Sequence, residues 1–204
     1  MTRFIDFLTA RNFLFLKIIG GILYLAFAVS EANSPWDLRV FYQASIDLME
    51  YKKDIYTYSI IEGGYNYFYG TFFAVVIYPF TFFTIEIVTF LWLLLNGFFL
   101  VRSWKHIKKW LGVDEFSEKR KLLFFCISLL FSFGLIKTNL HYSQVTIMMV
   151  FCVLEVFYQF EQKRKIAGSA LLGFVVMVKL LPLVMVPYLF YRRTLLELFR
   201  IKPL

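Results

Sequence analysis

Residues 71–101 read TFFAVVIYPFTFFTIEIVTFLWLLLNGFFLV, and this stretch decides the fold. A single straight helix of these 31 residues would be about 46 Å long, whereas the hydrocarbon core of a bilayer is about 30 Å thick. Pro79 and Glu86 interrupt the stretch, and a proline removes a helical hydrogen bond. The stretch therefore predicts a broken helix pair over residues 71–101: a short helix, a break between residues 79 and 84, and a membrane span around Trp92.

The composition of the whole chain favours the same environment. Of the 204 residues, 60% are apolar, 21% are aromatic and only 18% are charged, and the mean hydropathy is +0.67. Soluble domains are about half apolar and about a quarter charged. Together with the long apolar blocks, these values exclude a soluble globular domain, a disordered chain and a fibrous repeat. They predict an all-α polytopic membrane protein.

The distribution of charge predicts the orientation. The net charge is +8, and the basic residues cluster between apolar blocks, which favours contact with anionic lipid and not with nucleic acid. Residues 102–121 carry seven bases and three acids, so we expect a cytoplasmic loop there. Residues 31–70 carry six acids and three bases and are expected outside. Basic residues before the first apolar block place the N-terminus in the cytoplasm.

The first external loop contains a predicted surface helix over residues 36–51. In Ser34-Pro35-Trp36-Asp37, Ser34 is expected to cap the helix and Pro35 to occupy its first position. Apolar residues then recur at helical spacing, and these are Leu38, Phe41, Tyr42, Leu48 and Met49. This pattern is typical of an amphipathic helix on a membrane surface.

The apolar blocks predict one transmembrane domain over residues 1–204, with about five to seven membrane helices. The last apolar block is either one kinked span or a short hairpin whose halves meet outside at Lys179. The predicted parts are a first span at 13–30, the external loop 31–70, the broken pair 71–101, the cytoplasmic loop 102–121, a helical hairpin at 122–160 and the last block at 166–191.

No motif in the chain indicates a metal or a cofactor. The sequence has no Gly-rich phosphate loop, no nucleophile elbow and no Cys/His cluster with metal-ligand spacing. Cys126 and Cys152 lie inside apolar blocks and are interpreted as small buried hydrophobes. The candidates for chemistry are polar side chains on the predicted outer side: Asp37, Arg39, Tyr67, Tyr69, Asn139, Gln144 and Lys179.

These residues occur in a recognisable order. Asp37 lies in DLRVFY, Tyr67-Phe68-Tyr69 precedes a block that reaches Pro79, NLHYSQVT contains Asn139 and Gln144, and KLLP begins at Lys179. Over residues 35–195 this succession resembles glycosyltransferase family 87, polyprenyl-phosphate-mannose-dependent mannosyltransferases of the GT-C superfamily. Thr71 stands where that family usually has a proline. The chain resembles the N-terminal half of such enzymes, so we expect it to be truncated relative to the family.

The resemblance implies a GT-C-like helical bundle and a glycosyltransferase without metal or cofactor. A hexose, mannose in this family, would be transferred with inversion from a polyprenyl-phosphate sugar to a lipid or glycan acceptor. The enzyme would lie in a bacterial inner or plasma membrane, with its active site on the extracytoplasmic side. Asp37 would be the general base. Donor and substrate binding would fall to Arg39, Tyr67, Tyr69, Asn139, Gln144 and Lys179.

Other interpretations remain open. Asp37 is also an acid at a helix N-terminus, where it meets the helix dipole favourably, and the tyrosines are also typical of a membrane-interface belt. A non-catalytic fragment or assembly subunit of such an enzyme is the main alternative function. A small membrane transporter is the other, disfavoured because the sequence shows no inverted repeats.

Overall fold

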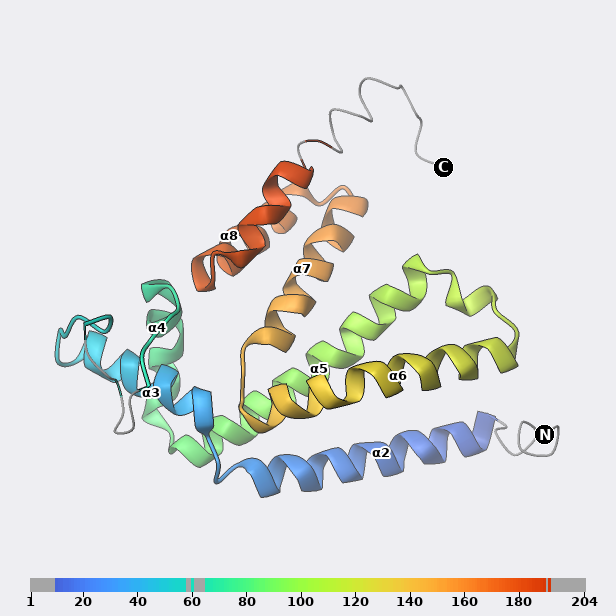
Figure 1. Cartoon of the computed structure of the whole chain (residues 1–204), viewed down its shortest axis with the longest axis horizontal. Coiled ribbons are helices and arrows are strands. Elements are labelled where there is room, and N and C mark those ends of the chain that lie inside the picture. Colours follow the sequence, from blue (N-terminus) through green and yellow to red (C-terminus); the bar gives the residue numbers. More distant parts are fainter. Residues whose placement is uncertain (1–9, 58–59, 61–64, 190, 192–204) are drawn as a thin grey trace.

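The computed structural model describes residues 10–57, 60, 65–189 and 191 (Figure 1). Every regular element in these ranges is a helix and none is a β-strand, which confirms the all-α prediction. The N-terminal segment 1–9 lies outside the described residues. The helices are α2 (Ala10–Glu31), α3 (Trp36–Met49), α4 (Thr71–Ile77), α5 (Ile85–Trp110), α6 (Glu118–His141), α7 (Thr146–Glu161) and α8 (Lys165–Val178), with short 3₁₀ helices at Tyr78–Phe82, Val113–Glu115 and Leu181–Val184.

Two of the described helices are long and apolar enough to cross a membrane. They are α5, with 26 residues, and α6, with 24 residues. At 1.5 Å per residue each exceeds the roughly 30 Å of a hydrocarbon core. Only Leu140 is buried along α6, so its apolar side chains face outward, as they would toward lipid tails. The number of membrane helices and their orientation stay predictions.

The remaining helices gather around α5. Helix α2 packs on it from one side and α7 from the other, and α7 also packs along α8. Helices α3 and α4 lie together at one end of the molecule, where α2 and α6 finish and α5 and α7 begin (Figure 1). The largest buried side chains of that end come from several of these elements, among them Leu38, Phe41, Phe73, Leu93 and Val145.

The start of α3 differs from the prediction. The helix begins at Trp36, so Pro35 precedes it, and no side chain caps it; the expectation that Ser34 is the cap is wrong. The backbone N–H of Asp37 instead donates to the carbonyl oxygen of Tyr142, 3.1 Å away. A partner from another part of the chain thus satisfies a donor that a cap would otherwise satisfy. The apolar face of α3 packs against the protein itself, since Leu38 and Phe41 are buried and the helix packs on α4.

The helix around Pro79 is interrupted. Helix α4 ends at Ile77, the 3₁₀ turn Tyr78–Phe82 follows, and extended backbone at Thr84 redirects the chain into α5. Proline explains the interruption because it lacks the N–H that a continuing helix needs. Side-chain bonds hold the break against α3: the hydroxyl of Tyr42 donates to the carbonyl oxygens of Thr81 and Phe83, at 3.0 and 2.9 Å.

A second break lies at the end of α8. Lys179 is extended, the 3₁₀ turn Leu181–Val184 follows, and the chain then reverses (Figure 1). The reversal is evident from ring contacts, because Phe160 of α7 packs against Gly168 near the start of α8, while its neighbour Phe157 meets Tyr188 at 5.9 Å. Lys179 therefore lies at the tip of a short hairpin, at the same end as α4.

Candidate functional site

Three hydrogen bonds to backbone carbonyl groups assemble one end of the molecule. The bond from Asp37 to Tyr142 joins the start of α3 to the turn between α6 and α7. The indole N–H of Trp92 in α5 donates to the carbonyl oxygen of Ser143 at 3.1 Å, which holds the same turn. These contacts come from segments far apart in the sequence, so the side chains around Asp37 can meet only in the folded chain.

The third contact requires a glycine. The N–H of Gly70 donates to the carbonyl oxygen of Val178 at 3.0 Å, which pins the loop before α4 to the end of α8. A Cβ atom at position 70 would collide with the carbonyl oxygen of Met177. Only a residue without a side chain permits this approach. Gly70 thereby sets Tyr69 beside Lys179.

Asp37 lies at the centre of this arrangement. Its carboxylate is half-buried, and burial raises its pKa above the ordinary value because the charged form loses hydration. A hydrogen bond from the side chain of Gln144 and the positive charge of Lys179 oppose that rise by stabilising the carboxylate. The structure thus brings Asp37, Gln144 and Lys179 together from α3, the α6–α7 turn and the tip of the α8 hairpin.

Tyr69 is the fourth member of this group. The ammonium nitrogen of Lys179 lies 5.3 Å from the centre of its ring, within the range of a cation–π contact. Phe41 of α3 packs edge-on against the same ring, with centroids 4.7 Å apart. Burial and the nearby charge of Asp37 raise the pKa of Tyr69 to about 12, so its hydroxyl keeps its proton and can donate a hydrogen bond at neutral pH.

Three other predicted site residues occupy different surroundings. Tyr67 is buried, and its hydroxyl donates to the carbonyl oxygen of Gly70 at 3.0 Å, which supports the loop. Asn139 closes the turn, because its backbone carbonyl accepts the N–H of Gln144 at 3.0 Å. Arg39 is exposed on α3, two residues after Asp37. Two residues turn a helix by about 200°, so the structure does not bring Arg39 to the group around Asp37.

The structure also places residues there that the sequence did not single out. The Nδ1 atom of His141, at the end of α6, lies 2.9 Å from a carboxylate oxygen of Glu31, at the end of α2. Trp36 packs against the rings of both His141 and Tyr142. Glu31 and His141 are 110 positions apart, and only their places at the outer ends of two apolar blocks hinted at this proximity.

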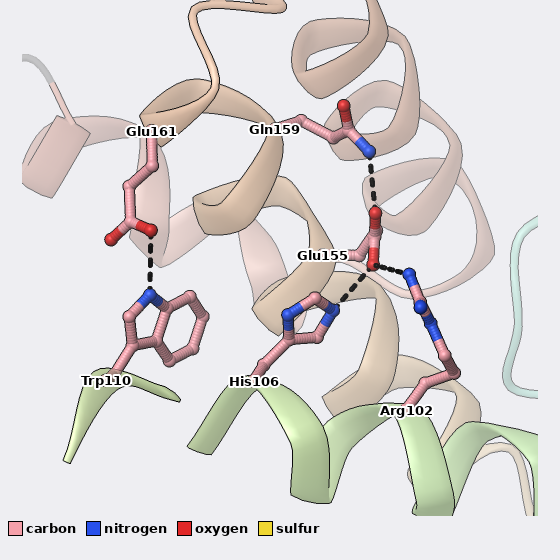
Figure 2. A network of polar contacts seen from close by, with 6 residues as sticks. All are labelled: Arg102, His106, Trp110, Glu155, Gln159 and Glu161. Carbon is pink, nitrogen blue, oxygen red and sulfur yellow. Dashed lines mark hydrogen bonds and ion pairs between the residues drawn. The ribbon is translucent and has the colours of Figure 1, made fainter. Parts of the chain in front are cut away.

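A second polar network connects the later part of α5 with α7 (Figure 2). One oxygen of Glu155 is 2.7 Å from Nε2 of His106 and 3.8 Å from the guanidinium of Arg102, and the other accepts a 2.6 Å hydrogen bond from Gln159. Both oxygens are thus engaged by the protein itself. Such internal satisfaction is typical of a buried pair that joins two helices, here α5 and α7.

Within the described part of the chain, no group of three or more His, Cys, Asp or Glu side chains is placed to hold a metal ion. What the group around Asp37 offers is a carboxylate with a raised pKa, a nearby ammonium and two neutral hydrogen-bonding groups. A carboxylate of this kind is suited to accept a proton, and the cation is suited to meet an anionic group.

Comparison with known proteins identifies the family. The model of glycosyltransferase family 87 matches residues 67–201, which include Tyr69, Gln144 and Lys179, whereas Asp37 precedes the matched segment. No curated protein and no solved structure matches the chain. The match covers well over half of the chain and confirms the resemblance found in the sequence, and the protein belongs to glycosyltransferase family 87.

Proposed function

We propose that this glycosyltransferase moves a hexose, mannose in the first instance, from a polyprenyl-phosphate sugar to a lipid or glycan acceptor. The reaction takes place at the extracytoplasmic face of a bacterial inner or plasma membrane. The observation that carries the proposal is the meeting of Asp37 with Gln144 and Lys179 in a chain of this family. A carboxylate and a cation held together suit a reaction in which a proton is removed while a phosphate departs.

The chemical step needs no group beyond donor, acceptor and these side chains. Asp37 accepts the proton of an acceptor hydroxyl, and the oxygen attacks the anomeric carbon of the donor sugar. The bond between that carbon and the phosphate oxygen breaks, and the electron pair leaves with the polyprenyl phosphate. The new glycosidic bond forms on the opposite face, so the configuration inverts. The proton stays on Asp37 until solvent removes it.

Lys179 and Tyr69 are proposed to bind the donor phosphate. The ammonium group stabilises the negative charge that grows on the leaving phosphate, and the protonated hydroxyl of Tyr69 adds a hydrogen bond. The packing of Lys179 on the Tyr69 ring limits where the ammonium group can move. The positive charge of Lys179 is proposed to supply here what a divalent ion supplies in other sugar transferases.

The other residues are proposed to support or extend this centre. Gln144 holds the carboxylate of Asp37 by a hydrogen bond, and Asn139 holds the turn that carries Gln144. Tyr67 is proposed to fix the loop under Tyr69. Arg39, exposed on α3 away from the group around Asp37, is proposed to contact the phosphate headgroups of the surrounding lipid.

The test is a transfer assay on the 204-residue protein in lipid bilayers with membrane glycolipids as acceptors. Polyprenyl-phosphate mannose, polyprenyl-phosphate glucose and GDP-mannose are offered separately, each with a labelled sugar, with and without EDTA. The proposal expects transfer from a polyprenyl-phosphate sugar, none from the nucleotide sugar, and no effect of EDTA. Transfer from GDP-mannose, or no consumption of either polyprenyl donor, contradicts it, and the second result supports a non-catalytic subunit.

A further inference from the structure

We propose that Trp36, His141 and Tyr142 form an acceptor platform, a surface that binds the sugar headgroup of a membrane glycolipid. This inference rests on the proposed function, because it names the class of acceptor that Asp37 deprotonates. It requires a ring surface open to a ligand, a polar group to orient the sugar, a connection to Asp37 and a place for the lipid chain.

The three rings form one exposed cluster. The centroid of Trp36 lies 5.7 Å from that of His141 and 5.5 Å from that of Tyr142, and the last two rings are 4.9 Å apart. The exposed fractions are 44% for Trp36, 37% for Tyr142 and 39% for the His141 side chain. The C–H face of a pyranose lies flat on such rings, whose faces carry partial negative charge.

The histidine adds direction to this surface. The carboxylate of Glu31 accepts a hydrogen bond from Nδ1 of His141 at 2.9 Å, and this bond fixes the orientation of the ring. No group in the described part of the chain forms a hydrogen bond with Nε2. A ring held by a carboxylate through one nitrogen presents the other to a ligand, here to a sugar hydroxyl.

The platform is continuous with the centre around Asp37. Trp36 directly precedes Asp37, and the Asp37 N–H is bonded to the carbonyl of Tyr142. Trp36 and Ser143, on the two sides of this contact, have positive φ angles of 26° and 51°. Left-handed backbone at non-glycine residues is uncommon and is concentrated at functional sites. Lys179, the proposed donor-binding cation, acts on the side chain of Asp37 through its charge, while Tyr142 of the platform accepts a hydrogen bond from the Asp37 backbone N–H, so the two ligands have separate neighbours.

The surface of α6 indicates that the acceptor carries a lipid chain. Phe131 and Leu135 are 78% and 70% exposed and lie four residues apart. Both residues lie on α6, and Tyr142 directly follows that helix, whose apolar side chains are exposed on its other faces as well, so the platform lies at the end of an apolar helix surface. A sugar on the platform therefore has an apolar track beside it. This arrangement favours a glycolipid over a water-soluble glycan.

The experiment measures binding by saturation-transfer NMR on the 204-residue protein in nanodiscs. The probes are octyl mannoside, methyl mannoside and citronellyl phosphate, which represent sugar with chain, sugar alone and lipid phosphate alone. The variants are Trp36→Ala and Lys179→Met. Tyr51→Ala is the matched control, since Tyr51 is an exposed aromatic residue of the same loop.

We expect octyl mannoside to bind more tightly than methyl mannoside, and Trp36→Ala to weaken octyl mannoside by about tenfold or more. Lys179→Met should weaken citronellyl phosphate and leave octyl mannoside unchanged, and Tyr51→Ala should change neither. Equal binding of octyl mannoside by Trp36→Ala and the unmodified protein would overturn the inference, as would dependence of that probe on Lys179.

Two further variants keep the test decisive. Trp36→Phe retains a ring and should lose less affinity than Trp36→Ala, and Tyr142→Ala replaces the test if Trp36→Ala does not fold. Because the readout is binding, failure of the platform and failure of the proposed function are distinguishable. If octyl mannoside binds in a Trp36-dependent manner but the protein shows no transfer activity, the proposed function is contradicted and the platform is not.

Discussion

Folding destabilises the charged form of the Asp37 carboxylate. Burial raises its pKa, while Gln144 and Lys179 lower it only in part. A carboxyl group whose pKa is higher in the folded protein contributes stability that is present at low pH and lost as the pH rises through that pKa. Once it is ionised, Asp37 therefore costs stability, a situation that is typical of functional sites.

This electrostatic balance predicts a shift in the pH profile of Lys179→Met. If Asp37 is the base, kcat/KM rises with pH as the carboxylate ionises. Removal of the cation removes one of the influences that lower the pKa of Asp37, so the acidic limb should move to higher pH. The control is Lys137→Met, which removes an exposed lysine near the end of α6 and should leave the limb in place. An unshifted acidic limb in Lys179→Met would show that Lys179 does not influence the pKa of Asp37.

The sequence singled out these residues as candidates, but it did not reveal which of them would lie together. Asp37, Tyr69, Gln144 and Lys179 were chosen because they are polar, lie on the predicted outer side and follow an order that resembles family 87. Lys179 stood out further because a lysine inside an apolar block is costly unless it is paired or faces water. Their proximity depends on backbone contacts such as that of Gly70 with Val178, which no spacing reveals. The Ser34 cap was wrongly predicted for the same reason, since the partner of the Asp37 N–H comes from a turn about a hundred positions away.

At the scale of elements, Glu155 joins α5 to α7. Glu155→Ala would leave His106 and Gln159 without their partner inside the protein, and loss of one member of such a buried pair costs about 3 kcal/mol or more. We expect a clearly lower melting temperature in a thermal scan. Glu155→Gln is the matched variant, because it preserves shape and most hydrogen bonds, and it should lose much less. Equal stability of the two variants would show that the network does not hold the helices together.

Gly70 offers a second test of how the elements meet. In Gly70→Ala the new methyl group collides with the Met177 carbonyl, so the loop before α4 must move away from the end of α8. We expect weaker donor binding, measured as a higher KM for a polyprenyl-phosphate sugar, because Tyr69 and Lys179 separate. Gly134→Ala is the control, since nothing lies within 4 Å of a Cβ there. An unchanged KM in Gly70→Ala would show that the contact between Gly70 and the end of α8 is not needed for donor binding.

The sequence showed helix interruptions better than helix packing. Pro79 and the charge of Lys179 marked places where a continuous helix is unfavourable, and the chain is interrupted at both. The extent of α6 was less evident, because the helix continues through the polar residues 137–141. The packing of α7 on α5 and α8 could not be predicted, because apolar residues occur on every side of these helices and do not mark one buried face.

For the whole molecule, charge predicts that the group around Asp37 and the loop after α5 lie on opposite sides of the membrane. Single cysteines at the exposed positions Lys52 and Glu115 test this in a background where Cys126 and Cys152 are alanine. A membrane-impermeant maleimide should label Lys52→Cys in intact cells and Glu115→Cys only after permeabilisation. Labelling of both from the same side would contradict the orientation.

In the proposed mechanism Asp37 accepts the proton of the acceptor hydroxyl, and the rate of sugar transfer by Asp37→Asn measures that role. Asparagine keeps the shape and removes the basicity, so transfer from labelled polyprenyl-phosphate mannose should fall by a factor of about 100 or more. Its melting temperature should be unchanged or higher, because the buried charge is gone. Glu50→Gln, which neutralises an exposed acid of the same loop, should transfer normally. Near-normal transfer by a folded Asp37→Asn protein would contradict the account.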